Sequence, residues 1–85
     1  MEKEGFWIFY WYNTKLKLSQ GNYQNGKKEG LWTYWHTNGR KALEGNFQNG
    51  KKEGIWTRWH RENGQEKSKE VYRNGGLKEY IIHNV

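Results

Sequence analysis

Two lysine pairs are the residues whose type and spacing most directly suggest chemistry. They recur 24 residues apart, each directly after an Asn-Gly pair: Lys27, Lys28, Lys51 and Lys52. In turns at one edge of a sheet, strands two apart would separate the pairs by roughly 9.5 Å. With aromatic residues nearby, this row of cations could bind single-stranded nucleic acid or anionic lipid. Lysine in turns is more often only solvated, and Glu29 and Glu53 offset part of the charge.

Two histidines, His36 and His60, also recur at equivalent places. A metal site would need a third ligand repeating with them, and the sequence has none. Nearby lysines disfavour a metal cation as well. We therefore interpret both histidines as polar residues at strand ends.

The residue types that enzyme chemistry needs are sparse. Aspartate and cysteine are absent, and no serine, histidine and acid fall at the spacing of a catalytic triad. Glu70 near Arg58 is interpreted as an ordinary ion pair on a sheet face. A face of exposed Trp could suit sugar rings, but Trp at a repeated position more often belongs to a core. We expect a protein that is not an enzyme, with no cofactor, no metal and no small-molecule substrate.

An internal repeat must position these residues. The string QNGKKEGLWT at Gln24–Thr33 returns almost unchanged, as QNGKKEGIWT, at Gln48–Thr57. Self-similarity at a fixed period predicts a stack of like units. The single domain, 1–85, divides into units 5–29, 30–53 and 54–75 and a closing half unit, 76–85.

Turn signals punctuate every unit. Asn-Gly, the preferred pair for type I′ hairpin turns, occurs at 25–26, 38–39, 49–50, 63–64 and 74–75. The segments between are rich in Trp, Tyr, Thr and Phe, and predict strands near 6–12, 16–23, 31–37, 40–47, 55–61, 65–72 and 77–82. The connections are too short for crossover helices. The predicted fold is all-β: a single twisted antiparallel meander sheet of about seven strands, built from three β-hairpin repeats.

The turns also predict the register. With Asn38-Gly39 as a two-residue turn, three cross-strand pairs are expected: Trp32 with Gly45, Tyr34 with Leu43, and His36 with Lys41. The outer hairpins absorb their extra residue in three-residue loops, 13–15 and 62–64.

This register places an aromatic ladder on one face of the sheet, consisting of Trp7, Trp32 and Trp56 with Tyr23, Phe47 and Tyr72 alongside. Each ring can bury ~150–250 Å², so we take this ladder face as the core. Glycine opposite Trp leaves room for the indole to lie across the strand. Ile81 is expected at the Trp position of the closing strand.

The first hairpin is predicted to be apolar on its other face as well. Its apolar residues there are Phe6, Ile8, Tyr10, Tyr12, Leu16 and Leu18, with Trp35 and Trp59 continuing the face. In the later hairpins polar residues dilute this face, which keeps Leu31, Trp35, Ile55, Trp59 and Val71. One interpretation is that a partner covers this surface, either another protein or a second copy pairing with the edge strand. The alternative is that the sheet curls over its own first hairpin.

The repeat resembles the MORN repeat in its bacterial variant form, through Glu44–Gly54 (EGNFQNGKKEG) and the strings around Tyr23 and Asn25. The pattern is also similar to YwqK-family antitoxins. The resemblance covers nearly the whole chain and implies a binding or scaffold module, in some proteins near membranes or lipids. Glu29-Gly30 and Glu53-Gly54 stand where a MORN repeat often has His-Gly.

The chain is basic, with a formal charge of +6, which favours solubility and weak attraction to polyanions. Its charged start and the lack of an 18-residue apolar run predict neither a signal peptide nor a membrane span, and a cytoplasmic location is the default expectation. The predicted function is a non-enzymatic protein-binding module, self-associating or antitoxin-like, with anionic lipid or nucleic-acid binding along the basic turns as the alternative.

Overall fold

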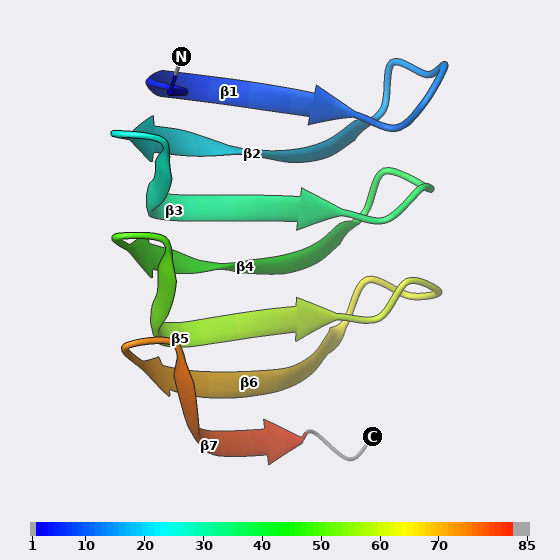
Figure 1. Cartoon of the computed structure of the whole chain (residues 1–85). Coiled ribbons are helices and arrows are strands. Elements are labelled where there is room, and N and C mark those ends of the chain that lie inside the picture. Colours follow the sequence, from blue (N-terminus) through cyan, green and yellow to red (C-terminus); the bar gives the residue numbers. More distant parts are fainter. Residues whose placement is uncertain (1, 83–85) are drawn as a thin grey trace.

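All seven predicted strands are present in the computed structural model, which describes residues 2–82. The strands are β1 (Gly5–Tyr10), β2 (Lys17–Gln24), β3 (Lys27–Trp35), β4 (Lys41–Gln48), β5 (Lys51–Trp59), β6 (Glu66–Arg73) and β7 (Gly76–Ile82). They form one antiparallel sheet in sequence order, and the sheet is not closed (Figure 1). No helix that could cross a membrane occurs among these residues. Residues 83–85 of the predicted closing half unit lie outside the described residues.

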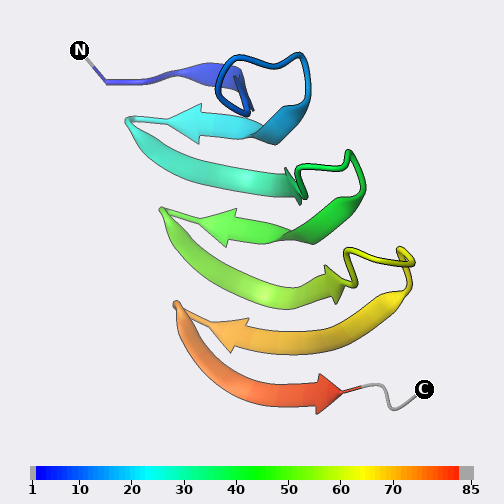
Figure 2. The ribbon, with the colours of Figure 1, turned by 90° about the vertical axis from the view of Figure 1, so that its right-hand side faces the viewer.

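The sheet is a single curved layer. Its principal extents are 45, 34 and 13 Å, and the hairpins stack beside one another without a second layer (Figure 2). The idea that the sheet curls back over its first hairpin is therefore wrong, because β1 lies at a free edge. Both faces of the first hairpin stay uncovered by residues 2–82.

Three of the five Asn-Gly pairs form the predicted type I′ turns. Both residues have positive φ at 25–26, 49–50 and 74–75, with values of 53° and 78°, 52° and 81°, and 52° and 84°. At 38–39 only the glycine does, so the predicted two-residue type I′ turn is wrong there. At 63–64, which was predicted to lie in a three-residue loop, only the glycine has positive φ as well. The asparagine side chains of those two pairs instead accept the N–H of Arg40 at 3.1 Å and of Gln65 at 2.9 Å. That local bond favours a different turn.

The three remaining loops are each one residue longer than predicted. Backbone bonds close them from Trp11 to Leu16, from His36 to Arg40 and from His60 to Gln65. One bulge per hairpin absorbs the difference, on the strand leaving the loop, at Leu18, Ala42 and Lys67. His36 consequently does not pair with Lys41, whose partner is Trp35. The predicted pairs Trp32–Gly45 and Tyr34–Leu43 are confirmed.

The aromatic ladder is confirmed. Its rings contact one another along the sheet, edge to face, with Tyr23 and Trp32 centroids 5.1 Å apart and Phe47 and Trp56 centroids 4.9 Å apart. Trp32 and Trp56 are fully buried, and they are the only buried apolar side chains among residues 2–82. The core of this protein is thus two indoles flanked by half-buried rings.

The space for each indole comes from a glycine of the preceding unit, and not, as predicted for Trp32, from the glycine that faces it in its own hairpin. A Cβ added to Gly21 would collide with the ring of Trp32, and one added to Gly45 with the ring of Trp56. Each indole also donates its Nε1–H to a carbonyl of the preceding unit, at Asn22 and Asn46, both at 3.0 Å. This contact joins one hairpin to the next.

The closing strand departs from the expected register. Tyr80, not Ile81, pairs with Glu70 and so occupies the Trp position. The strands β3 and β5 each carry two extra residues at a wide bulge, whereas β7 carries only one, at Lys78. The prediction for Ile81 assumed equal bulges and is wrong.

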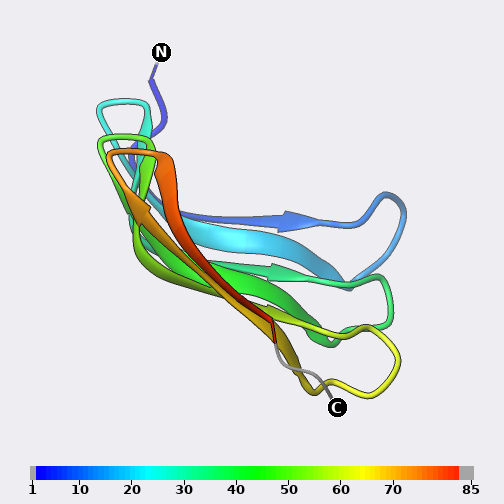
Figure 3. The same cartoon turned by 90° about the horizontal axis from the view of Figure 1, so that it is seen from below.

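The strands are bent along their length (Figure 3). Lys28 and Tyr34 lie six residues apart on β3, roughly 20 Å along a straight strand. Their side chains nevertheless meet, with Lys28 Nζ donating to the Tyr34 hydroxyl at 3.0 Å. Side chains converge in this way only on the inside of a bend, so the ladder face is concave and the reverse face convex.

Candidate protein-binding surface on the first hairpin

The six apolar residues predicted on the reverse face of the first hairpin are all accessible, and we call them the first-hairpin patch: Phe6, Ile8, Tyr10, Tyr12, Leu16 and Leu18. Phe6 is 57% exposed and Tyr10 is 51% exposed, while Leu18 is half-buried at its bulge. Tyr12 and Leu16 lie in the loop between β1 and β2 and not on the predicted strands. The patch therefore spans the β1 edge and the adjoining loop.

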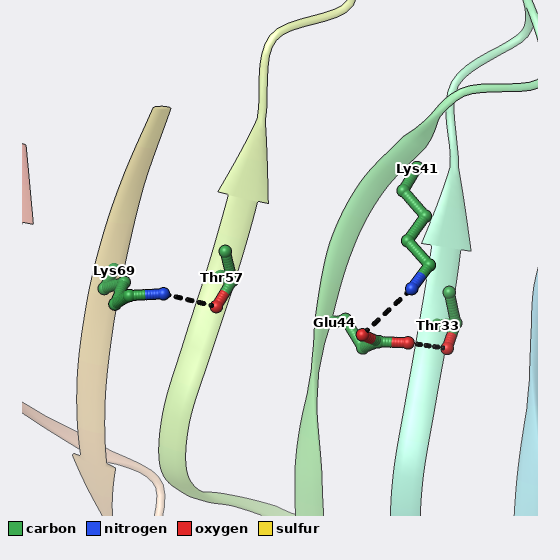
Figure 4. Close-up of polar contacts among 5 residues, drawn as sticks. All are labelled: Thr33, Lys41, Glu44, Thr57 and Lys69. Carbon is green, nitrogen blue, oxygen red and sulfur yellow. Dashed lines mark hydrogen bonds and ion pairs between the residues drawn. The ribbon is translucent and has the colours of Figure 1, made fainter. Parts of the chain in front are cut away.

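At the position of Ile8 and the residue facing it, the later hairpins carry paired polar groups. In the second hairpin Thr33 donates to Glu44 at 2.7 Å, and Lys41 forms an ion pair with the same carboxylate at 3.2 Å (Figure 4). In the third, Lys69 donates to Thr57 at 3.4 Å (Figure 4). Ile8 replaces these threonines in the first hairpin. Leu31 and Ile55, at the position of Phe6, are apolar and as exposed as Phe6, at 54% and 59%, so the first hairpin differs from the later ones at Ile8 and in its loop.

Trp35 and Trp59, the two tryptophans assigned to the same surface, are half-buried and covered. The ammonium of Lys17 lies 5.5 Å from the ring of Trp35, and that of Lys41 lies 5.5 Å from the ring of Trp59. Each lysine comes from the strand preceding its tryptophan. Tyr10 occupies the same repeat position on β1, where no strand precedes it. It therefore lacks the cation–π cover that the later units have.

A pocket of about 350 Å³ opens beside the patch at the loop end of the sheet. Its lining comes from the first and second hairpins and the third loop: Trp11, Leu18, Tyr34, Trp35, His36, Thr37, Ala42 and Arg61. Leu18 and Trp35 belong both to this pocket and to the predicted surface. Such a hollow next to exposed aromatic residues could hold an anchoring side chain of a partner. The sequence did not indicate this pocket, because it forms between loops of different units.

The four turn lysines do not form one row of free cations. Lys27 and Lys51 are exposed, but Lys28 and Lys52 turn onto the concave face. Lys28 Nζ lies 4.8 Å from the centroid of Trp32, and Lys52 Nζ lies 5.0 Å from that of Trp56. Burial, together with the charge of Arg58, lowers the pKa of Lys52 below its usual value. Half of the proposed anion-binding set therefore contacts the aromatic core.

A glutamate before each unit accepts a hydrogen bond from the turn that follows about 21 residues later. From the sequence, Glu29 and Glu53 were expected only to offset part of the lysine charge. The carboxylates of Glu4, Glu29 and Glu53 accept the backbone N–H of Asn25 at 2.7 Å, Asn49 at 3.0 Å and Asn74 at 2.8 Å. The nearly regular spacing of these glutamates, one before each unit, was the available signal. Their role depends on contacts about 21 residues away.

A polar cluster replaces part of the aromatic packing in the third unit. Arg58 Nε donates to Glu70 at 2.9 Å, as the predicted ion pair requires, and the Tyr72 hydroxyl donates to the same carboxylate at 2.9 Å. Burial alone would raise the pKa of Glu70, but these two donors outweigh it and hold that pKa below its usual value. Burial and the neighbouring carboxylate raise the pKa of Tyr72.

The histidine positions do not come together as a ligand set. Among residues 2–82, no group of three or more His, Cys, Asp or Glu side chains is placed to hold a metal ion. His36 Nε2 lies 3.1 Å from the Trp59 carbonyl, so its ring connects two neighbouring loops.

Comparison of the chain with family models, with curated proteins and with solved structures finds no match.

Proposed function

We propose that this chain is a non-enzymatic protein-binding module whose partner covers the first-hairpin patch. One observation carries the proposal: apolar side chains continue along the reverse face of β1 and into its loop, whereas the later hairpins carry a polar pair at the position of Ile8. In this single-layer sheet no other element among residues 2–82 buries them. Contiguous exposed apolar surface of this kind is typical of an interaction site.

The neighbouring pocket and free edge support the same proposal. Leu18 lines the pocket and Tyr10 lies in the adjoining patch, so truncating both removes apolar area from the proposed surface. Neither side chain belongs to the aromatic ladder. A partner protein, or a second copy of the chain, would then lose its anchor while the fold persists.

The test combines solution mass with site-specific photo-crosslinking of the full chain. A photoreactive phenylalanine replaces Phe6, and the control places it at the exposed Lys67 on the third hairpin. We expect either a concentration-dependent dimer or a protein adduct that excess unlabelled chain suppresses, at position 6 only. The double variant Tyr10→Ser/Leu18→Ser should lose the association and keep its far-UV and near-UV circular dichroism. A folded monomer without suppressible adducts overturns the proposal.

The resemblance to the MORN repeat enters the proposal in the same sense. Hairpin units joined through a repeated glycine–indole contact support a scaffold that presents variable faces to a partner. An antitoxin-like role would be one case of such binding.

Anion binding along the basic turns is the weaker candidate. Only Lys27 and Lys51 remain exposed, since Lys28 and Lys52 contact the ladder. Two exposed cations predict weak association with single-stranded RNA or acidic vesicles that disappears as salt rises from 50 to about 200 mM. Binding that persists at high salt and is abolished by Lys27→Ala/Lys51→Ala would favour this candidate over the protein-binding one.

A further inference from the structure

The edge strand β1 has the geometry of an interior strand. The glycine that opens each unit has a left-handed φ in all three cases: 82° at Gly5, 75° at Gly30 and 76° at Gly54. In β3 and β5 this glycine begins the wide bulge that faces the preceding strand. In β1, Gly5 adopts the same conformation although no strand precedes β1 in the sheet. Its backbone is therefore already shaped for a neighbour.

The residues before β1 are held in the same way. The Lys3 carbonyl accepts Gly26 N–H at 3.1 Å, as the Lys28 carbonyl accepts Gly50 N–H at 2.9 Å. Strand β3 begins at Lys27, but β1 begins only at Gly5, so residues 2–4 correspond to strand residues without a partner. They would lengthen β1 once a neighbour paired with them.

The exposure of Trp7 shows what is missing on the concave face. Trp32 and Trp56 are 0% exposed because each lies over a glycine of the preceding strand, whereas Trp7 is 38% exposed. Its Nε1–H donates to the Glu4 carbonyl at 3.1 Å, where the other two indoles bond to the preceding strand. Tyr10 on the reverse face is uncovered too. A single strand added at the β1 edge would cover both side chains, one on each face.

The two strands that fill this place elsewhere share a pattern. β2 reads Lys17-Leu-Ser-Gln-Gly21-Asn-Tyr23 and β4 reads Lys41-Ala-Leu-Glu-Gly45-Asn-Phe47. The lysine covers the reverse-face tryptophan of the next strand, Trp35 or Trp59. The glycine receives the indole of that strand's concave-face tryptophan, Trp32 or Trp56, and the aromatic ring packs against the same indole edge to face. The pattern Lys-x-x-x-Gly-Asn-(Phe/Tyr) thus describes a strand that docks before such a unit.

We infer that β1 binds, by antiparallel strand addition, an extended segment of a partner protein that carries the pattern Lys-x-x-x-Gly-Asn-(Phe/Tyr) or a close equivalent. The inference rests on the proposed function and specifies its partner. The partner's glycine lies under Trp7, its aromatic ring meets the indole edge, and its lysine covers Tyr10. Trp7 Nε1–H then donates to the partner's asparagine carbonyl instead of Glu4.

The backbone of β1 has donors for this addition. Trp11 N–H bonds to Leu16 toward β2, and alternate residues of a strand bond to opposite sides. The N–H groups of Ile8 and Tyr10 therefore face the free edge. Main-chain bonds would supply affinity, and the glycine requirement would supply specificity.

A second copy does not fit this place equally well. The pattern occurs only in β2 and β4, and both are already paired on each side within the sheet. β1 does not carry the pattern, and its one glycine, Gly5, is the first residue of the strand and has a left-handed φ. A β1–β1 dimer is a distinct outcome of the test.

The experiment uses the whole chain and a capped synthetic peptide with the β4 sequence, KALEGNFQ. The matched control peptide changes only the glycine, as KALEANFQ. We expect saturable binding followed by NMR, with the Trp7 indole N–H shifting and the Ile8 and Tyr10 amides gaining protection from hydrogen exchange. The alanine peptide should bind at least tenfold more weakly, and Trp7→Ala in the chain should have the same effect.

The inference is overturned if the glycine peptide does not saturate the chain at millimolar concentration. It is equally overturned if both peptides bind alike, or if the chain forms a β1–β1 dimer. If the peptide titration fails but photo-crosslinking at position 6 still gives an adduct that excess unlabelled chain suppresses, the proposed function stands. If neither peptide binding nor the position-6 adduct is found, the proposed function is overturned as well.

Discussion

At the residue scale, the contact between a glycine and the indole of the next unit is the most constrained feature of the molecule. Gly21 and Gly45 are buried, and a methyl group at either would enter the ring of Trp32 or Trp56. Neither indole can retreat, since each is enclosed and holds a backbone carbonyl. Small changes there should therefore have large effects.

Gly45→Ala should lower the free energy of unfolding by about 3 kcal/mol, the upper end for an overpacked core. Urea denaturation followed by Trp fluorescence measures the change. Gly76→Ala is the matched control, because its φ is not left-handed and the nearest atom, the Arg73 carbonyl, is 3.5 Å away. That control should be neutral or slightly stabilising. Equal effects at both sites would contradict the proposed packing.

The cluster around Glu70 predicts a pH dependence of stability. The pKa of Glu70 is lower in the folded state than its usual value, so the ionised carboxylate stabilises the fold. This stabilisation is present above the unfolded pKa of about 4.3 and is lost as pH falls through the lower folded pKa. Glu70→Gln should weaken the fold at pH 7 and flatten its loss of stability below about pH 4.5.

Thermal unfolding of both proteins at pH 7 and pH 3 measures this. Glu79→Gln on the exposed strand β7 is the control, and it should follow the parent protein at each pH. If Glu70→Gln kept the same acid sensitivity as the parent, the Arg58 and Tyr72 bonds would not be the cause.

At the scale of elements, each of the three type I′ turns, at 25–26, 49–50 and 74–75, depends on a carboxylate that precedes its unit. Glu29→Ala should lower the free energy of unfolding by about 1 kcal/mol, because the Asn49 N–H loses its acceptor in a turn that must keep positive φ. Hydrogen exchange of the Asn49 amide should accelerate. Glu79→Ala, again on β7, should stay within about 0.5 kcal/mol of the parent. Unchanged exchange at Asn49 would remove the role assigned to Glu29.

The sequence predicted the order of the strands, the ladder face and two register pairs of the middle hairpin, because Asn-Gly spacing and ring periodicity are local signals. It could not predict the extra bulge at Leu18, Ala42 and Lys67, since a bulge and a longer loop leave the same residue count. It also missed which glycine receives which indole. That assignment depends on how neighbouring units stack, as does the pocket between loops.

At the scale of the whole molecule, the sheet differs between its two edges. β1 keeps the left-handed opening glycine, the indole and the aromatic reverse face of an interior unit, while β7 has a smaller bulge and an exposed Tyr80 at the Trp position. The first edge thus offers a shaped surface, and the last one does not repeat it. This asymmetry is why we place partner binding at β1.

The array should tolerate loss of one whole unit better than loss of half a unit. Deleting Gly30–Glu53 joins Glu29 to Gly54, which restores the Glu-Gly junction and places Trp56 over Gly21. Deleting only Gly30–Lys41 joins the start of β3 to β4 and destroys the alternation of the two strand types. Because strands pair only with sequence neighbours, stability should be roughly a sum over units. Circular dichroism and urea titration should show a folded, less stable protein for the 24-residue deletion and an unfolded chain for the 12-residue one. The reverse order would mean that units are not interchangeable and that the glycine–indole contact does not define the repeat.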